Sequence, residues 1–174
     1  MTASTPAPTP SPTPEWERRI AELWATFDDH EPDDFLVRVR TLVAELPAEH
    51  AVGLFELAAA HDSTGHEQRA ATLYERARTA GLTGVRRRRA AIQLAGTYRN
   101  LDRSEESVAI LTAELEAPSD ELDDAVAAFL ALALVDVGRA REATALALGA
   151  LSRHLPRYNR SLTHYAEALV TETP

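Results

Sequence analysis

The stretch Phe55–Ala77, "FELAAAHDSTGHEQRAATLYERA", decides the fold because the chain repeats its pattern twice. It can be laid over "IQLAGTYRNLDRSEESVAILTAE" (92–114) and "FLALALVDVGRAREATALALGA" (129–150). A leucine followed by alanine returns after 37 and then 36 residues, at Leu57, Leu94 and Leu130. Apolar residues in each copy recur at steps of three and four, which predicts helices. Three copies of this length predict stacked helical hairpins.

The recurring residue types are those that close helix packing requires. Small side chains occupy equivalent places in the two helices of each hairpin, at Ala58, Ala95, Ala131, Ala70, Ser107 and Ala143. Small residues let paired helices approach closely. The turn between the helices falls at Gly65, Asp102 and Gly138. A single hairpin cannot bury both of its faces, so each must stack on the next and the ends need capping helices.

The remaining sequence also shows helical periodicity, and no stretch alternates like a strand. Apolar stripes at 16–27 and 32–46 predict an N-terminal capping helix pair at 15–47. Further helices are expected at about 48–63, 66–80, 83–101, 104–116, 119–137, 139–153 and 156–170. They form a domain at 48–174, in which the final helix caps the stack through Tyr158, Leu162, Tyr165 and Leu169. The predicted fold class is all-α, a right-handed superhelical stack of antiparallel helix pairs.

The first fourteen residues, "MTASTPAPTPSPTP", alternate proline with small polar residues. This composition predicts a disordered tail at 1–14. The tail lacks the basic start and apolar middle of a secretory signal. The longest apolar run, 125–135, is shorter than the roughly 20 residues that cross a bilayer. We therefore expect no membrane association and a cytoplasmic location.

The charge and composition exclude several functional classes. The net charge is −9 with a pI near 5.1, which disfavours nucleic acid as a partner because the chain repels polyanions. The chain has no cysteine, so disulfides, thiolate nucleophiles and cysteine-bound metals are excluded. All 18 basic residues are arginine and alanine is abundant, which is typical of a GC-rich bacterial genome.

Residues from about His50 to Val170 resemble the tetratricopeptide repeat, in the bacterial group often called group 5. The resemblance lies in the leucine-alanine pairs, in Tyr74 and Tyr98, and in the blocks "RRRRAAIQLAGTYRNL", "FLALALVDVGR" and "HLPRYNRSLTHYAEAL". It implies a superhelix of helix pairs whose concave face binds other proteins. No settled activity comes with this group.

The sequence departs from the repeat pattern at three positions. His61 replaces a larger apolar residue, Asp102 replaces the turn glycine, and Ala147 replaces a large residue. The chain also has no lysine, which some members of the family use to hold a C-terminal carboxylate. A partner recognised through that carboxylate is therefore not predicted.

No catalytic or metal-binding pattern appears. His61 and His66 are five residues apart, which places them on different helix faces, and we expect His61 to be a hydrogen-bonded core residue. The acidic cluster at 120–124 lacks the glycine and the alternating oxygen ligands of a calcium loop. We predict that the chain is not an enzyme and has no cofactor, catalytic residue or metal site.

The four consecutive arginines, Arg86–Arg89, permit three interpretations. Shifting by the repeat interval aligns Arg87 and Arg88 with Asp123 and Asp124, and Arg86 with Glu49. Arginines at a helix N-terminus oppose the macrodipole, so acidic neighbours in the adjacent repeat would offset that cost. An inter-repeat charge ladder is the favoured interpretation. Contacts to a partner, or to nucleic acid, are the alternatives.

The functional surface is expected on the concave face, which the first helix of each pair lines. The predicted partner-binding residues are Phe55, Asp62, Arg89, Ile92, Gln93, Gly96, Arg99, Asn100 and Leu132. This mixture of apolar residues with a few polar ones suits a protein or peptide partner. The first functional hypothesis is a scaffold or adaptor that binds a protein or peptide partner in its groove. Self-association through the end helices is a further possibility under this hypothesis. The alternative is a sensor of a phosphorylated small molecule or nucleic acid that uses Arg86–Arg89 and Arg99.

Overall fold

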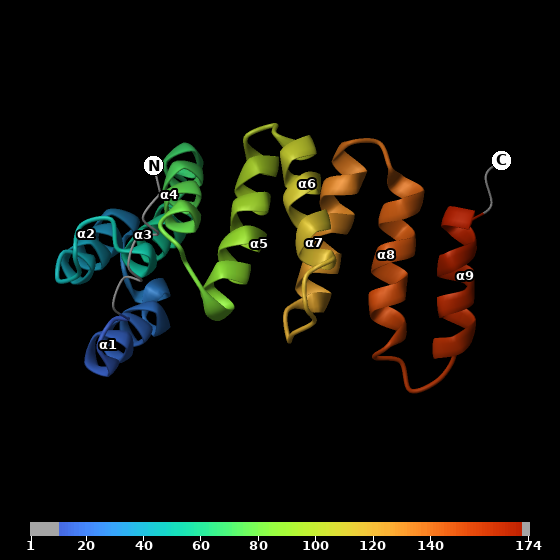
Figure 1. Cartoon of the computed structure of the whole chain (residues 1–174), viewed down its shortest axis with the longest axis horizontal. Helices are drawn as coiled ribbons and strands as arrows, with labels where there is room; N and C mark the ends of the chain where they lie inside the picture. The colour runs from blue at the N-terminus through green and yellow to red at the C-terminus, as the bar shows by residue number, and fades with distance from the viewer. Residues whose placement is uncertain (1–10, 172–174) are drawn as a thin grey trace, which may run out of the picture. The chain divides into compact units, whose positions relative to one another are not determined.

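A computed structural model describes residues 11–171, in which every regular element is a helix (Figure 1). The helices are α1 (Pro14–Ala25), the 3-10 turn η1 (Phe27–Asp29), α2 (Pro32–Val43), α3 (Ala51–Ser63), α4 (Glu67–Thr79), α5 (Gly84–Asn100), α6 (Ser104–Leu115), α7 (Asp123–Asp136), α8 (Ala140–Ser152) and α9 (Asn159–Thr171). The predicted all-α stack of helix pairs is confirmed. Of the predicted tail, residues 1–10 lie outside the described residues, and α1 already begins at Pro14.

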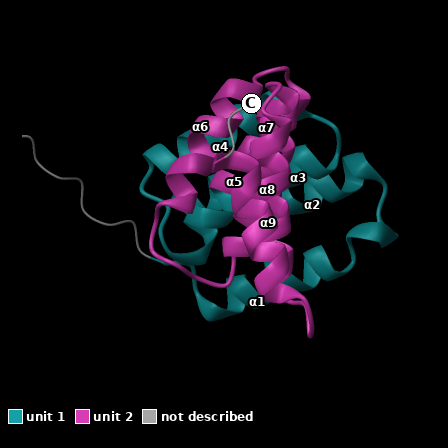
Figure 2. Cartoon of the chain, turned by 90° about the vertical axis from the view of Figure 1, so that its right-hand side faces the viewer, with its two compact units in different colours: residues 1–90 teal, residues 91–174 magenta. Residues whose placement is uncertain are grey.

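The chain forms two compact units, residues 1–90 and 91–174, which Figure 2 colours separately. The division falls within α5, so its arginine-rich start belongs to unit 1 and its remainder to unit 2. The right-handed superhelix concerns both units together and stays a prediction, as do the expected domain boundaries at 15 and 48.

Unit 1 has a core built where α1, α2 and α3 meet. Its buried residues are Trp16, Ile20, Phe35, Leu36, Val39, Leu42 and Ala60. The indole of Trp16 donates a hydrogen bond to the carbonyl oxygen of Leu42 at 2.8 Å. The ring of Phe35 meets Trp24 and Phe27 edge-on, with centroids 4.9 and 4.8 Å apart. The two predicted apolar stripes therefore pack on each other.

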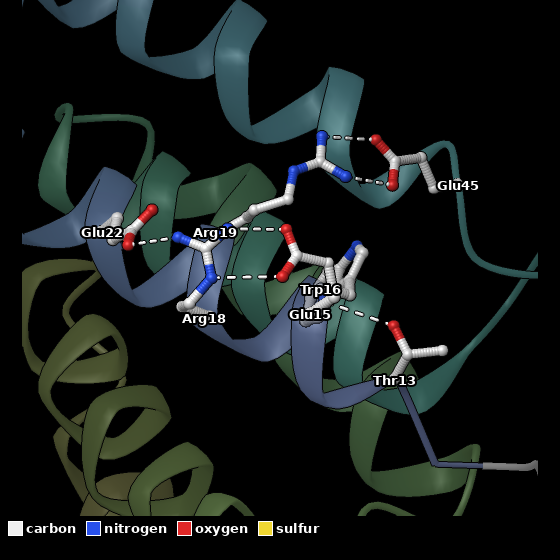
Figure 3. A network of polar contacts seen from close by, with 7 residues as sticks. All are labelled: Thr13, Glu15, Trp16, Arg18, Arg19, Glu22 and Glu45. Atoms are coloured by element: carbon white, nitrogen blue, oxygen red, sulfur yellow. Dashed lines mark hydrogen bonds and ion pairs between the residues drawn. The ribbon is translucent and has the colours of Figure 1, made fainter.

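Polar contacts at the start of α1 fix its position (Figure 3). Thr13 caps the helix, because its hydroxyl accepts the backbone N–H of Trp16 at 3.2 Å. Arg19 donates two hydrogen bonds of 2.7 Å to the carboxylate of Glu45, just beyond α2. These bonds lower the pKa of Glu45. The bidentate pair thus links α1 to the end of α2.

Unit 2 has its own core, formed by α5, α6, α7 and α8. Its buried residues are Ile92, Ala95, Val108, Leu111, Val126, Leu130, Ala131, Ala133, Leu134 and Ala143. The small repeat residues Ala95, Ser107 and Ala143 are at most 3 % exposed. They lie where the sequence predicted close helix approach, so the helix pairs pack as the repeat pattern requires.

The three aligned turns share one backbone conformation. Gly65, Asp102 and Gly138 have φ angles of 75°, 59° and 78°. The residue after each donates its N–H to the carbonyl five positions back, at 2.9 Å after Gly65 and at 2.8 Å after the other two. This bond defines the Schellman motif that ends helices at a left-handed residue. Asp102 therefore performs the role of the missing glycine.

Three helices begin three or four residues later than predicted. The helix expected from 48 begins at Ala51, because Glu49 has a φ of 59°. The helix expected from 156 begins at Asn159, because Tyr158 has a φ of 68°. The helix expected from 119 begins at Asp123, after a turn in which a carboxylate oxygen of Asp120 accepts the N–H of Leu122 at 2.7 Å.

The predicted role of α9 as a cap is corrected in part. Ala166 is buried in unit 2, and Leu162 and Leu169 are half-buried. Tyr158 and Tyr165, which were expected to pack inward, are 77 % and 67 % exposed. The helix therefore covers α8 with its small and aliphatic side chains, whereas Tyr165 on the helix and Tyr158 just before it face solvent.

Candidate functional site

Arg86, the first arginine of the run, binds two carboxylates inside unit 1. Its Nη1 and Nη2 atoms donate to Glu17 at 2.9 and 2.6 Å, and its Nε donates to Glu56 at 3.0 Å. Glu56 also accepts a hydrogen bond of 2.8 Å from the indole of Trp24. The predicted pairing of Arg86 with Glu49 is wrong, since Glu49 instead binds Arg76.

The electrostatics of this network explain why the arginine is there. Glu56 is only 4 % exposed and needs a positive partner, because a buried carboxylate without one is costly. Burial by itself lowers the pKa of Arg86, but the hydrogen bonds and negative charges of Glu17 and Glu56 outweigh it and raise the pKa overall. Arg86 therefore holds α1, α3 and the start of α5 together and is not available as a phosphate ligand.

The other arginines of the run differ in exposure. Arg88 is 2 % exposed, whereas Arg89 is exposed and its guanidinium lies 5.4 Å from the centre of the Phe55 ring. In unit 2, Asp124 binds Arg153, and its other oxygen lies 2.7 Å from Nε2 of His154. Pairing of Arg87 and Arg88 with Asp123 and Asp124 would join both units and stays a prediction.

An apolar strip on α7 is exposed in unit 2. It consists of Phe129, Leu132 and Val135, which are 37 %, 48 % and 55 % exposed. They recur every three residues, so they share one side of the helix. The sequence of α7, "DDAVAAFLALALVD", is apolar on all sides between Asp124 and Asp136. Packing against α6 and α8 covers only part of such a helix, and the α7 strip is what remains uncovered.

Helix α5 borders the α7 strip. A side chain at Gly96 would begin 3.6 Å from the Phe129 ring, so the two residues are neighbours. At the far end, Nε of Arg99 donates to Asp136 at 2.5 Å. The side-chain oxygen of Gln93 is buried and has no hydrogen-bond partner within residues 11–171. The face thus combines an apolar strip, a glycine beside it and an ion pair at its far end.

The structure divides the predicted partner-binding residues between the units. Unit 2 contains Ile92, Gln93, Gly96, Arg99, Asn100 and Leu132, whereas unit 1 contains Phe55, Asp62 and Arg89. Phe55 is fully buried and Ile92 is 7 % exposed, so neither side chain is exposed for direct contact with a partner. The exposed ring of Phe129 was not among the predicted residues. The uninterrupted apolar character of α7 was the signal that could have identified it.

The interior of unit 1 also contains buried polar side chains, among them His61 and Tyr74. His61 is 5 % exposed, so its predicted burial is confirmed, but its Nδ1 atom has no hydrogen-bond partner within residues 11–171, so the predicted hydrogen bonding is wrong for that atom. Burial, followed by the positive charge of Arg40, lowers the pKa of His61. Its ring contacts that of His66, with centroids 5.4 Å apart. Burial also raises the pKa of the Tyr74 hydroxyl. Over the part of the chain that the structure describes, no three metal-ligating side chains converge.

A hollow of about 750 Å³ lies beside the turn between α5 and α6. Arg99 and Arg103 line it, but each already binds a carboxylate, Arg99 that of Asp136 and Arg103 that of Glu106. The Arg103 guanidinium also stacks 3.9 Å from the Tyr98 ring. Because these cations are occupied, the hollow gives no support to a phosphate site at Arg99.

Comparison with known families adds an independent finding. A family described as "Tetratrico peptide repeat" matches residues 51–169, which is more than half of the chain. No curated protein and no solved structure matches the chain. None of the helices within residues 11–171 is long and apolar enough to span a membrane.

Proposed function

The chain belongs to the tetratricopeptide repeat family, and from this premise we propose that it is a non-enzymatic adaptor that binds a protein or peptide on unit 2. The proposed surface is the α7 strip together with Gln93, Gly96 and Arg99 of α5. The observation that carries the proposal is the exposure of three large apolar side chains in one line on α7. Contiguous exposed apolar residues with polar neighbours mark interaction sites.

The geometry supports a partner with its own line of apolar side chains. An amphipathic helix fits, because its apolar residues also recur every three or four positions. Gly96 leaves room for a close approach beside Phe129.

Affinity purification from the native host, with matched variants, tests this proposal. Leu132→Asp with Val135→Asp places charges on the α7 strip, whereas Val37→Asp alters an equally exposed valine on α2 of unit 1. Proteins identified by mass spectrometry should be lost with the α7 variant and kept with the control. Partners that both variants retain would show that the α7 strip is not the binding surface. Sedimentation velocity of the purified chain tests self-association at the same time.

The phosphate or nucleic-acid alternative lacks a comparable observation. Arg86 is bound by Glu17 and Glu56, and Arg99 is bound by Asp136. Ionic strength separates the two functions, because phosphate binding weakens steeply with added salt and apolar binding changes little.

A further inference from the structure

The end of unit 2 carries a positive region in a chain of net charge −9. No acidic residue occurs between Glu142 and Glu167, whereas three arginines and two histidines do, Arg153, His154, Arg157, Arg160 and His164. These residues cover the end of α8, the turn that follows and the first half of α9. The sign of the local charge is therefore opposite to that of the whole molecule.

Two of these arginines are available to a partner. Asp124 engages Arg153 and His154. Arg157 and Arg160 are exposed and have no ion-pair partner within residues 11–171. Arg160 lines a shallow groove of about 360 Å³ beside α9, and Glu167 lines the same groove further along the helix.

Tyr158, between the two free arginines, has an unusual backbone. Its φ of 68° lies in the left-handed region, and its side chain is 77 % exposed. Glu49 and Asp102 are the other non-glycine residues in this region within the described chain. A bulky aromatic residue is disfavoured there, and glycine would fit without strain. An exposed aromatic side chain held at such a position suggests a functional reason for it.

We propose that the turn between α8 and α9 is a second docking surface, which binds an acidic segment of a partner protein. Carboxylates of the segment bind Arg157 and Arg160 as charge-assisted pairs, and an apolar side chain of the segment packs on Tyr158. This surface is separate from the α7 strip, so the proposal does not depend on the adaptor function argued above.

A peptide fits this surface better than nucleic acid. Glu167 lies along the groove, where it repels a phosphate backbone but accepts the N–H groups that a peptide carries. The net charge of −9 also opposes a long polyanion, whereas a short acidic segment lies within the local field of the arginines.

Fluorescence anisotropy with the full chain tests the proposal. The probe is a labelled twelve-residue peptide with four glutamates and two leucines, and the comparison probes are its glutamine counterpart and a twelve-nucleotide oligothymidine. Arg157→Ala with Arg160→Ala should weaken binding of the acidic peptide by about tenfold. The matched control is Arg69→Ala with Arg78→Ala, which removes two exposed arginines of α4 that have no ion-pair partner within residues 11–171. It should leave the affinity unchanged.

Tyr158→Gly separates binding from folding. Glycine suits a φ of 68°, so the melting temperature should be maintained or raised while the affinity for the acidic peptide falls. Three results would overturn the proposal. The acidic peptide could fail to bind at millimolar concentration, the Arg69→Ala, Arg78→Ala control could lose as much affinity as the Arg157→Ala, Arg160→Ala variant, or oligothymidine could bind more tightly than the acidic peptide. The third result would assign the surface to nucleic acid.

Discussion

At the scale of single residues, Arg86 shows how a charge can be needed for folding. It offsets the buried carboxylate of Glu56 and holds Glu17 at the same time. Arg86→Ala should lower the free energy of unfolding by about 2–3 kcal/mol, because it leaves Glu56 without a positive partner. Arg78→Ala, at an exposed position, should change it by less than about 0.5 kcal/mol. Urea unfolding of both variants measures the difference, and equal effects would show that the network is dispensable.

The lowered pKa of His61 predicts that the stability of the fold depends on pH. Burial lowers its pKa in the folded state, so in mildly acidic solution the unfolded chain binds a proton that the folded chain does not. The free energy of unfolding is therefore highest above about 6.5, the pKa of His61 in the unfolded chain, and declines as the pH falls toward the lower pKa of His61 in the folded chain. His61→Phe should reduce the loss of melting temperature between pH 7.5 and pH 5. An unchanged loss would assign the acid sensitivity to other groups.

Asp102 occupies a left-handed turn in which its two counterparts are glycine. Asp102→Gly should stabilise the chain by about 0.5–1 kcal/mol, because glycine adopts this conformation without strain. Asp102→Ala keeps the strain and removes only the carboxylate, so it serves as the control and should not stabilise. Thermal unfolding of the two variants gives the comparison, and a loss of stability in the glycine variant would mean that the carboxylate has a structural role.

At the scale of helices, two glycines inside α5 and α3 are expected to respond differently to alanine. A side chain at Gly96 would meet Phe129 at an ordinary 3.6 Å, whereas one at Gly53 would lie 3.0 Å from a methyl group of Val43. Gly96→Ala should therefore stabilise α5 by about 0.5–1 kcal/mol, the usual gain within a helix. Gly53→Ala should gain less or lose stability. A Gly96→Ala variant that is more stable but binds the partner less tightly would also support close approach at Gly96.

At the scale of the whole molecule, the two proposed surfaces of unit 2 should act independently. Leu132→Asp with Val135→Asp removes apolar contacts, so it should abolish binding of the captured partner and leave the acidic peptide bound. Arg157→Ala with Arg160→Ala should do the reverse. Added salt should strongly weaken binding of the acidic peptide and hardly change binding of the apolar partner, because screening by salt acts on charge pairs. If either variant lost binding of both the captured partner and the acidic peptide, the two ligands would share one surface.

The amino-acid sequence by itself determined the features that depend on local order along the chain. Helical periodicity, the spacing of the repeats, the small residues at helix contacts and the turn shared by Gly65, Asp102 and Gly138 are all visible in it. Each of these depends on residues a few positions apart, or on a pattern that simply recurs, and so the family could also be recognised.

Only the tertiary structure decided which distant side chains meet and which stay exposed. Arg86 binds Glu17, 69 residues earlier in the chain, although the repeat register pointed to Glu49. Tyr158 and Tyr165 face solvent, although their apolar pattern suggested packing, because α9 meets α8 mainly through its smaller side chains. The α7 strip is exposed because neighbouring helices cover only part of a helix that is apolar on all sides between its terminal aspartates. Periodicity shows that a helix can be buried, but the arrangement of its neighbours determines which face they cover.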